Sequence, residues 1–139
     1  MVLAEVFTGA ACESCVAADL AVDLARETFP DTKLIVLNYH NHIPSPDPLT
    51  SSDSEERATQ YSAQSTPVVF VNGVKIDDVG GFFFPEMIDN SYRKLRAPID
   101  FFLKTSTEIK IDLKAEVVDT NLVVGVEVTG IPEDELKNM

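Results

Sequence analysis

The chain has 139 residues, of which 45% are hydrophobic, so it is long enough for one domain or slightly more with a packed core. Its formal net charge of −12 argues against binding to nucleic acid or to an anionic membrane surface, because both attract basic patches. No run approaches the roughly 20 apolar residues of a membrane-spanning helix, so we expect no membrane span.

Both cysteines of the chain lie close to its start, in the sequence Cys12-Glu13-Ser14-Cys15. The apolar residues 2–7 predict a strand before them, and apolar spacing predicts a helix from Cys12 to about Thr28. Two cysteines separated by two residues in the first turn of a helix can form a disulfide. The helix N-terminus favours a thiolate at the first cysteine, and the second thiol can resolve a mixed disulfide. The pattern therefore indicates redox chemistry.

Two alternatives to redox chemistry remain open at this point. A Cys-x-x-Cys pair is also half of a zinc site, and Cys12 and Cys15 with His40 and His42 would supply four ligands for zinc or copper in a metal-binding module or metallochaperone. His40 and His42 are two residues apart and point to opposite sides of an extended segment, so at most one would reach the thiols. The other alternative is an inert disulfide in an interaction domain.

The rest of the chain alternates strand and helix patterns up to residue 97. The run 33–38 is nearly continuously apolar, which predicts a central parallel strand buried on both faces. A proline-rich loop follows, and Ser52-Asp-Ser-Glu55 predicts a capping box. Asn72-Gly73 predicts a hairpin, Pro85 opens a helix, and the three phenylalanines 82–84 are expected in the core. In order, these later elements are a helix at 53–63, strands at 68–71 and 74–79, and a helix at 85–96.

The character of the chain changes after Pro98, because proline disfavours helix at the preceding Ala97. Residues 108–113, 114–118 and 122–128 alternate apolar and polar side chains around a turn at 119–121. We therefore predict a domain at 1–98 and a β-strand extension at 99–139, which reads as the start of a truncated β-sandwich. Exposed strand edges there make a homodimer through these strands plausible.

Three stretches carry a resemblance: Glu5-Val-Phe-Thr-Gly9, Cys12-Glu-Ser-Cys15, and Tyr61-Ser-Ala-Gln-Ser-Thr-Pro-Val-Val-Phe-Val-Asn-Gly73. Over residues 2–97 the chain resembles the thioredoxin-like superfamily, and within it a secreted bacterial branch related to outer-membrane lipoprotein thioredoxin-like proteins. The resemblance implies an α/β, thioredoxin-like fold and a thiol–disulfide oxidoreductase acting on protein or small-molecule disulfides. It also implies a redox partner protein, no cofactor, and a periplasmic or other extracytoplasmic location.

The same resemblance implies roles for individual residues. Cys12 would be the attacking thiolate and Cys15 the resolving thiol. Thr66-Pro67 matches a motif with a cis-proline, where the preceding backbone pairs with a substrate peptide. Glu5 would be a buried acid that shuttles protons to the resolving cysteine, or else a surface-facing strand residue. Glu13 beside Cys12 should disfavour the thiolate, which predicts a modestly reducing or isomerase-like potential.

Overall fold

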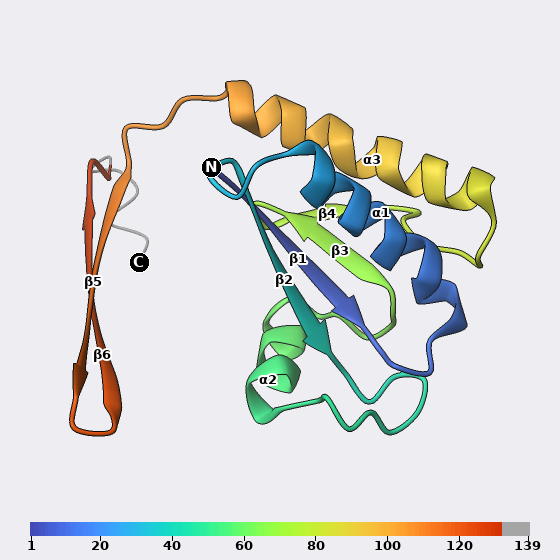
Figure 1. The fold of residues 1–139 in the computed structure, drawn as a ribbon, viewed down its shortest axis with the longest axis horizontal. Coiled ribbons are helices and arrows are strands. Elements are labelled where there is room, and N and C mark those ends of the chain that lie inside the picture. The colour runs from blue at the N-terminus through green and yellow to red at the C-terminus, as the bar shows by residue number, and fades with distance from the viewer. Residues whose placement is uncertain (132–139) are drawn as a thin grey trace. The chain divides into compact units, whose positions relative to one another are not determined.

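The computed structural model describes residues 1–131 of the chain. Its internal contacts divide the chain into two compact units, one of residues 1–104 and one that begins at Thr105. The first unit holds β1 (Val2–Thr8), a 3-10 turn at Glu13–Cys15, α1 (Val16–Thr28), β2 (Leu34–His40), α2 (Ser52–Gln60), β3 (Val68–Val71), β4 (Val74–Ile76) and α3 (Pro85–Lys104) (Figure 1). Within the described residues, no helix is long and apolar enough to cross a membrane.

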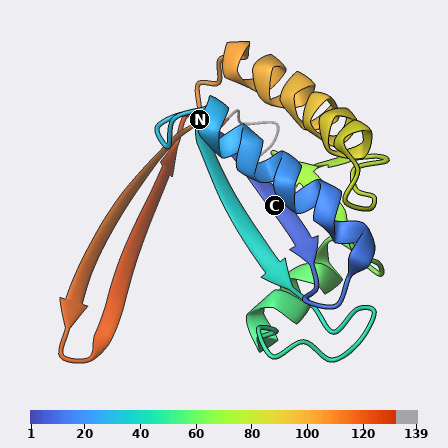
Figure 2. The same ribbon diagram turned by 45° about the vertical axis from the view of Figure 1, so that its right-hand side comes forward.

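The first unit is built on a four-stranded mixed sheet with the strand order β2-β1-β3-β4. β1 runs parallel to β2 and antiparallel to β3, and β3 pairs antiparallel with β4. α1 and α3 pack together on one face of the sheet, and α2 lies on the other face (Figures 1 and 2). A βαβ half joined to a ββα half in this strand order is the thioredoxin-like fold, so the predicted fold class is confirmed.

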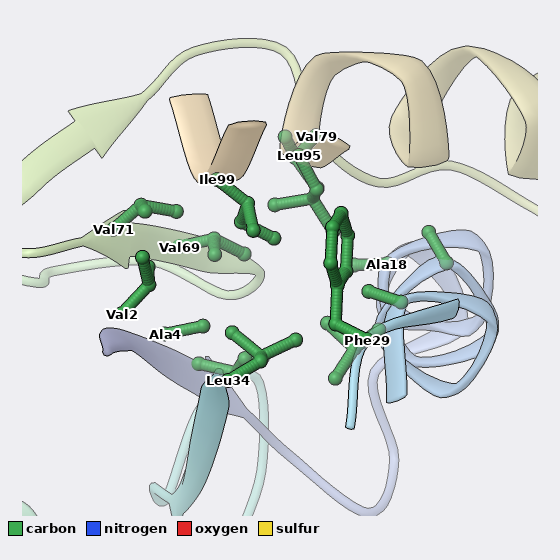
Figure 3. Close-up of a cluster of buried hydrophobic side chains, with 14 residues drawn as sticks. Val2, Ala4, Ala18, Phe29, Leu34, Val69, Val71, Val79, Leu95 and Ile99 are labelled. Carbon is green, nitrogen blue, oxygen red and sulfur yellow. The ribbon is translucent and has the colours of Figure 1, made fainter. Parts of the chain in front are cut away.

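The side chains of β1 alternate between two hydrophobic cores. Val2, Ala4 and Val6 face α1 and α3, where they meet buried residues such as Phe29, Leu95 and Ile99 (Figure 3). Phe7 faces α2, and its ring stacks on Tyr39 at a centroid distance of 5.2 Å. Each fully buried large apolar side chain stabilises the fold by about 1.5–3 kcal/mol. β1 therefore contributes buried apolar side chains to both faces of the sheet, as a central strand requires.

β2 lies at the edge of the sheet, and the prediction of a central strand buried on both faces is wrong. Ile35 and Leu37 are 41% and 42% exposed. A continuous apolar run indicates a strand but not its position in the sheet. That position is decided by β1, which pairs with both β2 and β3.

Two helix ends also differ from the prediction. Ser51, not Ser52, caps α2: its hydroxyl accepts a hydrogen bond from the Ser54 N–H, and the Ser54 hydroxyl accepts one from the Ser51 N–H. α3 does not end near Arg96 but continues through Pro98 to Lys104. A proline inside a helix costs about 3 kcal/mol. Leu95 and Ile99 are each only 1% exposed, so burial on both sides of Pro98 offsets that cost.

The second unit contains one antiparallel hairpin, formed by β5 (Lys110–Val118) and β6 (Asn121–Thr129). The stretches 108–113 and 114–118 thus contribute to a single strand. Pairs such as Ile111 with Val128 and Leu113 with Val126 give the hairpin one apolar face, as the alternation requires. All residues of both strands are exposed. The assignment of this hairpin to a truncated β-sandwich stays a prediction, and residues 132–139 lie outside the described residues.

Candidate active site at the start of the first helix

The two cysteines are joined by a disulfide in a tight turn. Their Cα atoms are 5.3 Å apart, and the Cys15 N–H donates to the Cys12 carbonyl at 3.0 Å. This turn is 3-10 helix, so the α-helix begins at Val16 and not at Cys12 as predicted. Cys15 is 1% exposed and Cys12 is 7% exposed. Cys12 is therefore the sulfur closer to solvent.

Cys12 lines a surface groove of about 430 Å³, called here the Cys12 groove. Its walls come from residues 11–14, Ile43-Pro44, residues 64–66 and Phe82. The Thr66 hydroxyl donates to the Ile43 carbonyl at 3.0 Å, which ties two of these walls together. The peptide bonds Thr66-Pro67 and Ile43-Pro44 are both cis. Four segments far apart in the sequence thus meet beside one sulfur.

Gly80 and Gly81 attach the cysteine turn to the segment after β4. The Gly81 N–H donates to the Ser14 carbonyl at 2.7 Å, and the Ala17 N–H donates to the Gly81 carbonyl at 3.0 Å. Gly80 has φ +124°, and a Cβ there would lie 2.4 Å from Cγ of Pro67 and 2.9 Å from the Ser14 carbonyl oxygen. Only glycine fits this position without a shift of its neighbours. In the sequence this position is visible only as one of a pair of glycines, Gly80-Gly81, before the helix that Pro85 opens.

The expectation that Phe82, Phe83 and Phe84 belong to the core is wrong. They are 50%, 72% and 54% exposed, and Phe82 lines the Cys12 groove. They lie in the segment between β4 and α3, called here the phenylalanine turn. Composition alone favoured burial, since large apolar residues are usually inside.

Glu5 is buried, but on the side of the sheet that faces α2. Its carboxylate accepts hydrogen bonds from Nε of Arg57 at 2.8 Å and from the Tyr61 hydroxyl at 2.6 Å, and it is 1% exposed. The bond to Glu5 raises the pKa of Arg57, and burial followed by the same carboxylate raises the pKa of Tyr61. The surface-facing alternative is therefore wrong. The cysteine turn leads into α1 on the opposite face, so the shuttle role of Glu5 stays a prediction without a supporting contact.

His40 and His42 both bind Asp47. Nδ1 of His40 lies 2.8 Å from Oδ2 of Asp47, and the Asp47 N–H donates to Nδ1 of His42 at 2.9 Å. The buried Asp47 carboxylate also accepts from the Ala10 N–H at 2.7 Å, so it holds the backbone just before the cysteine turn. The hydrogen bond from His40, followed by backbone N–H groups, lowers the pKa of Asp47 to about 2.

The proposed metal ligands do not assemble in the structure. Within residues 1–131, no three or more histidine, cysteine, aspartate or glutamate side chains are placed to hold a metal ion. The set of Cys12, Cys15, His40 and His42 is thus not brought together. Its two histidines brace the loop beyond β2 through Asp47 instead.

Asp19 is a candidate that the sequence did not reveal. It lies four residues after Cys15, a spacing that places two side chains on one face of a helix about 5–6 Å apart. Its carboxylate accepts a hydrogen bond from the buried Thr8 hydroxyl at 3.3 Å, at the end of β1. Burial raises the pKa of Asp19, while Thr8 and the nearby His40 oppose that shift. No pattern along the chain points to Asp19, because its contact with Thr8 joins two different elements.

No family model matches the chain, and no curated protein matches it either. Among solved structures, a structural-genomics protein from Agrobacterium tumefaciens is similar with 18% identity and a TM-score of 0.49, over 93% of this chain and 72% of that one. Glutaredoxin 1 from Francisella tularensis, solved with cacodylate, is similar with 14% identity and a TM-score of 0.33, over 76% of this chain and 100% of that one. The fold assignment rests on the chain's own strand order, which is that of the thioredoxin-like fold, with the Cys12–Cys15 disulfide just before α1.

Proposed function

We propose that the protein is a thiol–disulfide oxidoreductase that acts on protein or small-molecule disulfides. One observation carries this proposal: Cys12 and Cys15 form a disulfide in which Cys12 lines a groove and Cys15 does not. Such an arrangement separates an attacking sulfur from a resolving one. An inert structural disulfide has no need of a groove beside one of its sulfurs.

The proposed reaction has two exchange steps. In the reduced protein, the Cys12 thiolate attacks one sulfur of the substrate disulfide, a mixed disulfide forms, and the other substrate sulfur leaves as a thiolate. The Cys15 thiolate then attacks the Cys12 sulfur and releases the second substrate thiol. The substrate gains two electrons, and the Cys12–Cys15 pair loses them in forming its disulfide. A redox partner protein would return the pair to its dithiol state.

Thr66 and Pro67 would hold a substrate peptide beside Cys12. Thr66 lines the Cys12 groove, and neither its N–H nor its C=O is hydrogen-bonded to any residue among 1–131. An extended peptide can pair with such free backbone groups as an added strand. This supports a protein or peptide disulfide as the substrate.

The proton acceptor for Cys15 would be Asp19. Thiol–disulfide exchange requires Cys15 to lose a proton before it attacks Cys12, and a neighbouring carboxylate can accept it. Asp19 follows Cys15 by four residues in the first turn of α1 and bonds to Thr8, whereas Glu5 is held by Arg57 on the side of the sheet that faces α2. The shuttle role of Glu5 stays an alternative, which would require its carboxylate to act while bonded to Arg57 and Tyr61.

The experiment compares two variants of the reduced protein in an insulin-reduction assay. Cys15→Ser should trap a mixed disulfide through Cys12, visible as a covalent adduct by mass spectrometry, because no second thiol releases it. Cys12→Ser should form no adduct and should lose the activity. Normal insulin reduction by Cys12→Ser would refute the proposal.

We further propose a secreted bacterial origin with an extracytoplasmic location. The stretches Glu5–Gly9 and Tyr61–Gly73 support this location through their resemblance to the secreted branch, and cell fractionation tests it.

We also propose a homodimer through β5 and β6. The exposed apolar face of the hairpin supports this dimer, since an isolated two-stranded hairpin is at best marginally stable in water. A monomer by sedimentation at micromolar concentration would contradict it.

A further inference from the structure

The phenylalanine turn contributes apolar surface to the Cys12 groove through Phe82. Phe82 is part of the groove wall, and Phe83 and Phe84 follow it directly with most of their surface exposed. The Phe84 N–H donates to the Phe82 carbonyl at 2.7 Å, and the Met87 N–H donates to the Phe84 carbonyl at 3.0 Å. Just before this turn, Gly81 is bonded to Ser14 of the cysteine turn. These bonds fix the backbone of the turn next to the cysteine turn, with Phe82 in the same groove as Cys12.

The charge of the groove is negative. Of the described residues that line it, only Glu13 carries a formal charge, and none is lysine or arginine. The chain as a whole has a net charge of −12. An anionic ligand would thus meet a carboxylate and find no cation to pair with, while a basic ligand would be attracted.

We propose that the substrate is a disulfide-bearing peptide segment whose cysteine is flanked by apolar and by neutral or basic residues, with Phe82 and Glu13 setting this preference. The inference rests on the proposed oxidoreductase function and names its substrate class. An apolar flanking side chain packs on Phe82, and the peptide backbone pairs with Thr66. Glutathione disulfide is a poor substrate because its carboxylates face Glu13. The redox step is the exchange written above, in which the peptide disulfide is reduced to two thiols and the Cys12–Cys15 dithiol is oxidised.

The test measures second-order rates of the reduced full-length chain with four disulfides. These are an apolar basic peptide, its acidic counterpart, a polar neutral peptide of the same length, and oxidised glutathione. The apolar basic peptide should react at least about tenfold faster than the acidic peptide and glutathione. Phe82→Ala should lower the apolar-over-polar preference about tenfold, equivalent to ~1.4 kcal/mol. Glu13→Gln should lower the basic-over-acidic preference several-fold.

A matched control is Phe101→Ala, which removes another ring that is 64% exposed, near the C-terminal end of α3. Its rates should equal those of the unmodified chain. Equal rates for glutathione and the apolar basic peptide, or an unchanged preference in Phe82→Ala, would overturn this inference while leaving the proposed function intact. If the reduced chain reacts with none of the four disulfides, the proposed function is overturned, and this inference with it.

Discussion

Replacing Gly80 by alanine should destabilise the protein by two separable effects. The backbone at Gly80 has φ +124°, and an L-residue held in such a region costs about 1–3 kcal/mol. The added Cβ would also lie 2.4 Å from Cγ of Pro67, and forcing extra volume into a packed site costs about 1–3 kcal/mol more. The free energy of unfolding should therefore fall by about 2–6 kcal/mol, a large part of the 5–15 kcal/mol typical of a domain.

Gly73→Ala separates the two effects. Gly73 also has positive φ, +78°, but the nearest atom to its added Cβ is the Tyr61 hydroxyl oxygen at 3.9 Å, an ordinary contact. Urea unfolding of the oxidised proteins should thus show a smaller loss for Gly73→Ala, and its exchange rate with a peptide disulfide should be normal. Gly80→Ala should also exchange more slowly, because Pro67 or Ser14 must move. Equal losses of stability in the two variants, with equal exchange rates, would refute the reasoning.

Two further predictions concern the proton acceptor and the second unit. Asp19→Asn should slow the release of the mixed disulfide about a hundredfold at neutral pH. It should also remove an acidic limb from the pH–rate profile, at a pH above the ordinary aspartate range because burial raises the pKa of Asp19. The control is Asp53→Asn, at an exposed position on α2, and an unchanged profile in Asp19→Asn contradicts the role. Deletion of residues 105–139 should leave exchange by Cys12 and Cys15 intact and weaken any dimer, and global unfolding of 1–104 by circular dichroism would show that these strands complete the first core.

The sequence was most informative where the signal is local. The spacing of Cys12 and Cys15, the Asn72-Gly73 turn and the strand alternation each depend on neighbours along the chain, and all three appear in the structure. The predictions that were wrong depend on contacts with residues far away in the sequence. Pro98 stays helical because Leu95 and Ile99 are both buried by the sheet and α1.

The same limit applies to the candidate site. A carboxylate at residue 5 can serve catalysis or structure, and its partner Arg57 lies 52 residues later, where no local pattern reveals the contact. The sequence suggests His40 and His42 as metal ligands, but in the structure both bind Asp47. Asp19 became a candidate only through Thr8 on a different element. A residue type gives the available chemistry, and tertiary contacts decide whether it is used.

The hydrogen bonds between Gly81 and the cysteine turn involve main-chain atoms only. The attachment therefore does not depend on which side chains stand at positions 13 and 14. Replacement of Glu13 or Ser14 can change the charge beside Cys12, and with it the stability of the thiolate, while the turn stays bound to Gly81. The position of the cysteine turn and the reactivity of Cys12 can therefore change independently of each other. Substitutions at residues 13 and 14 can alter the thiolate without releasing the turn from Gly81.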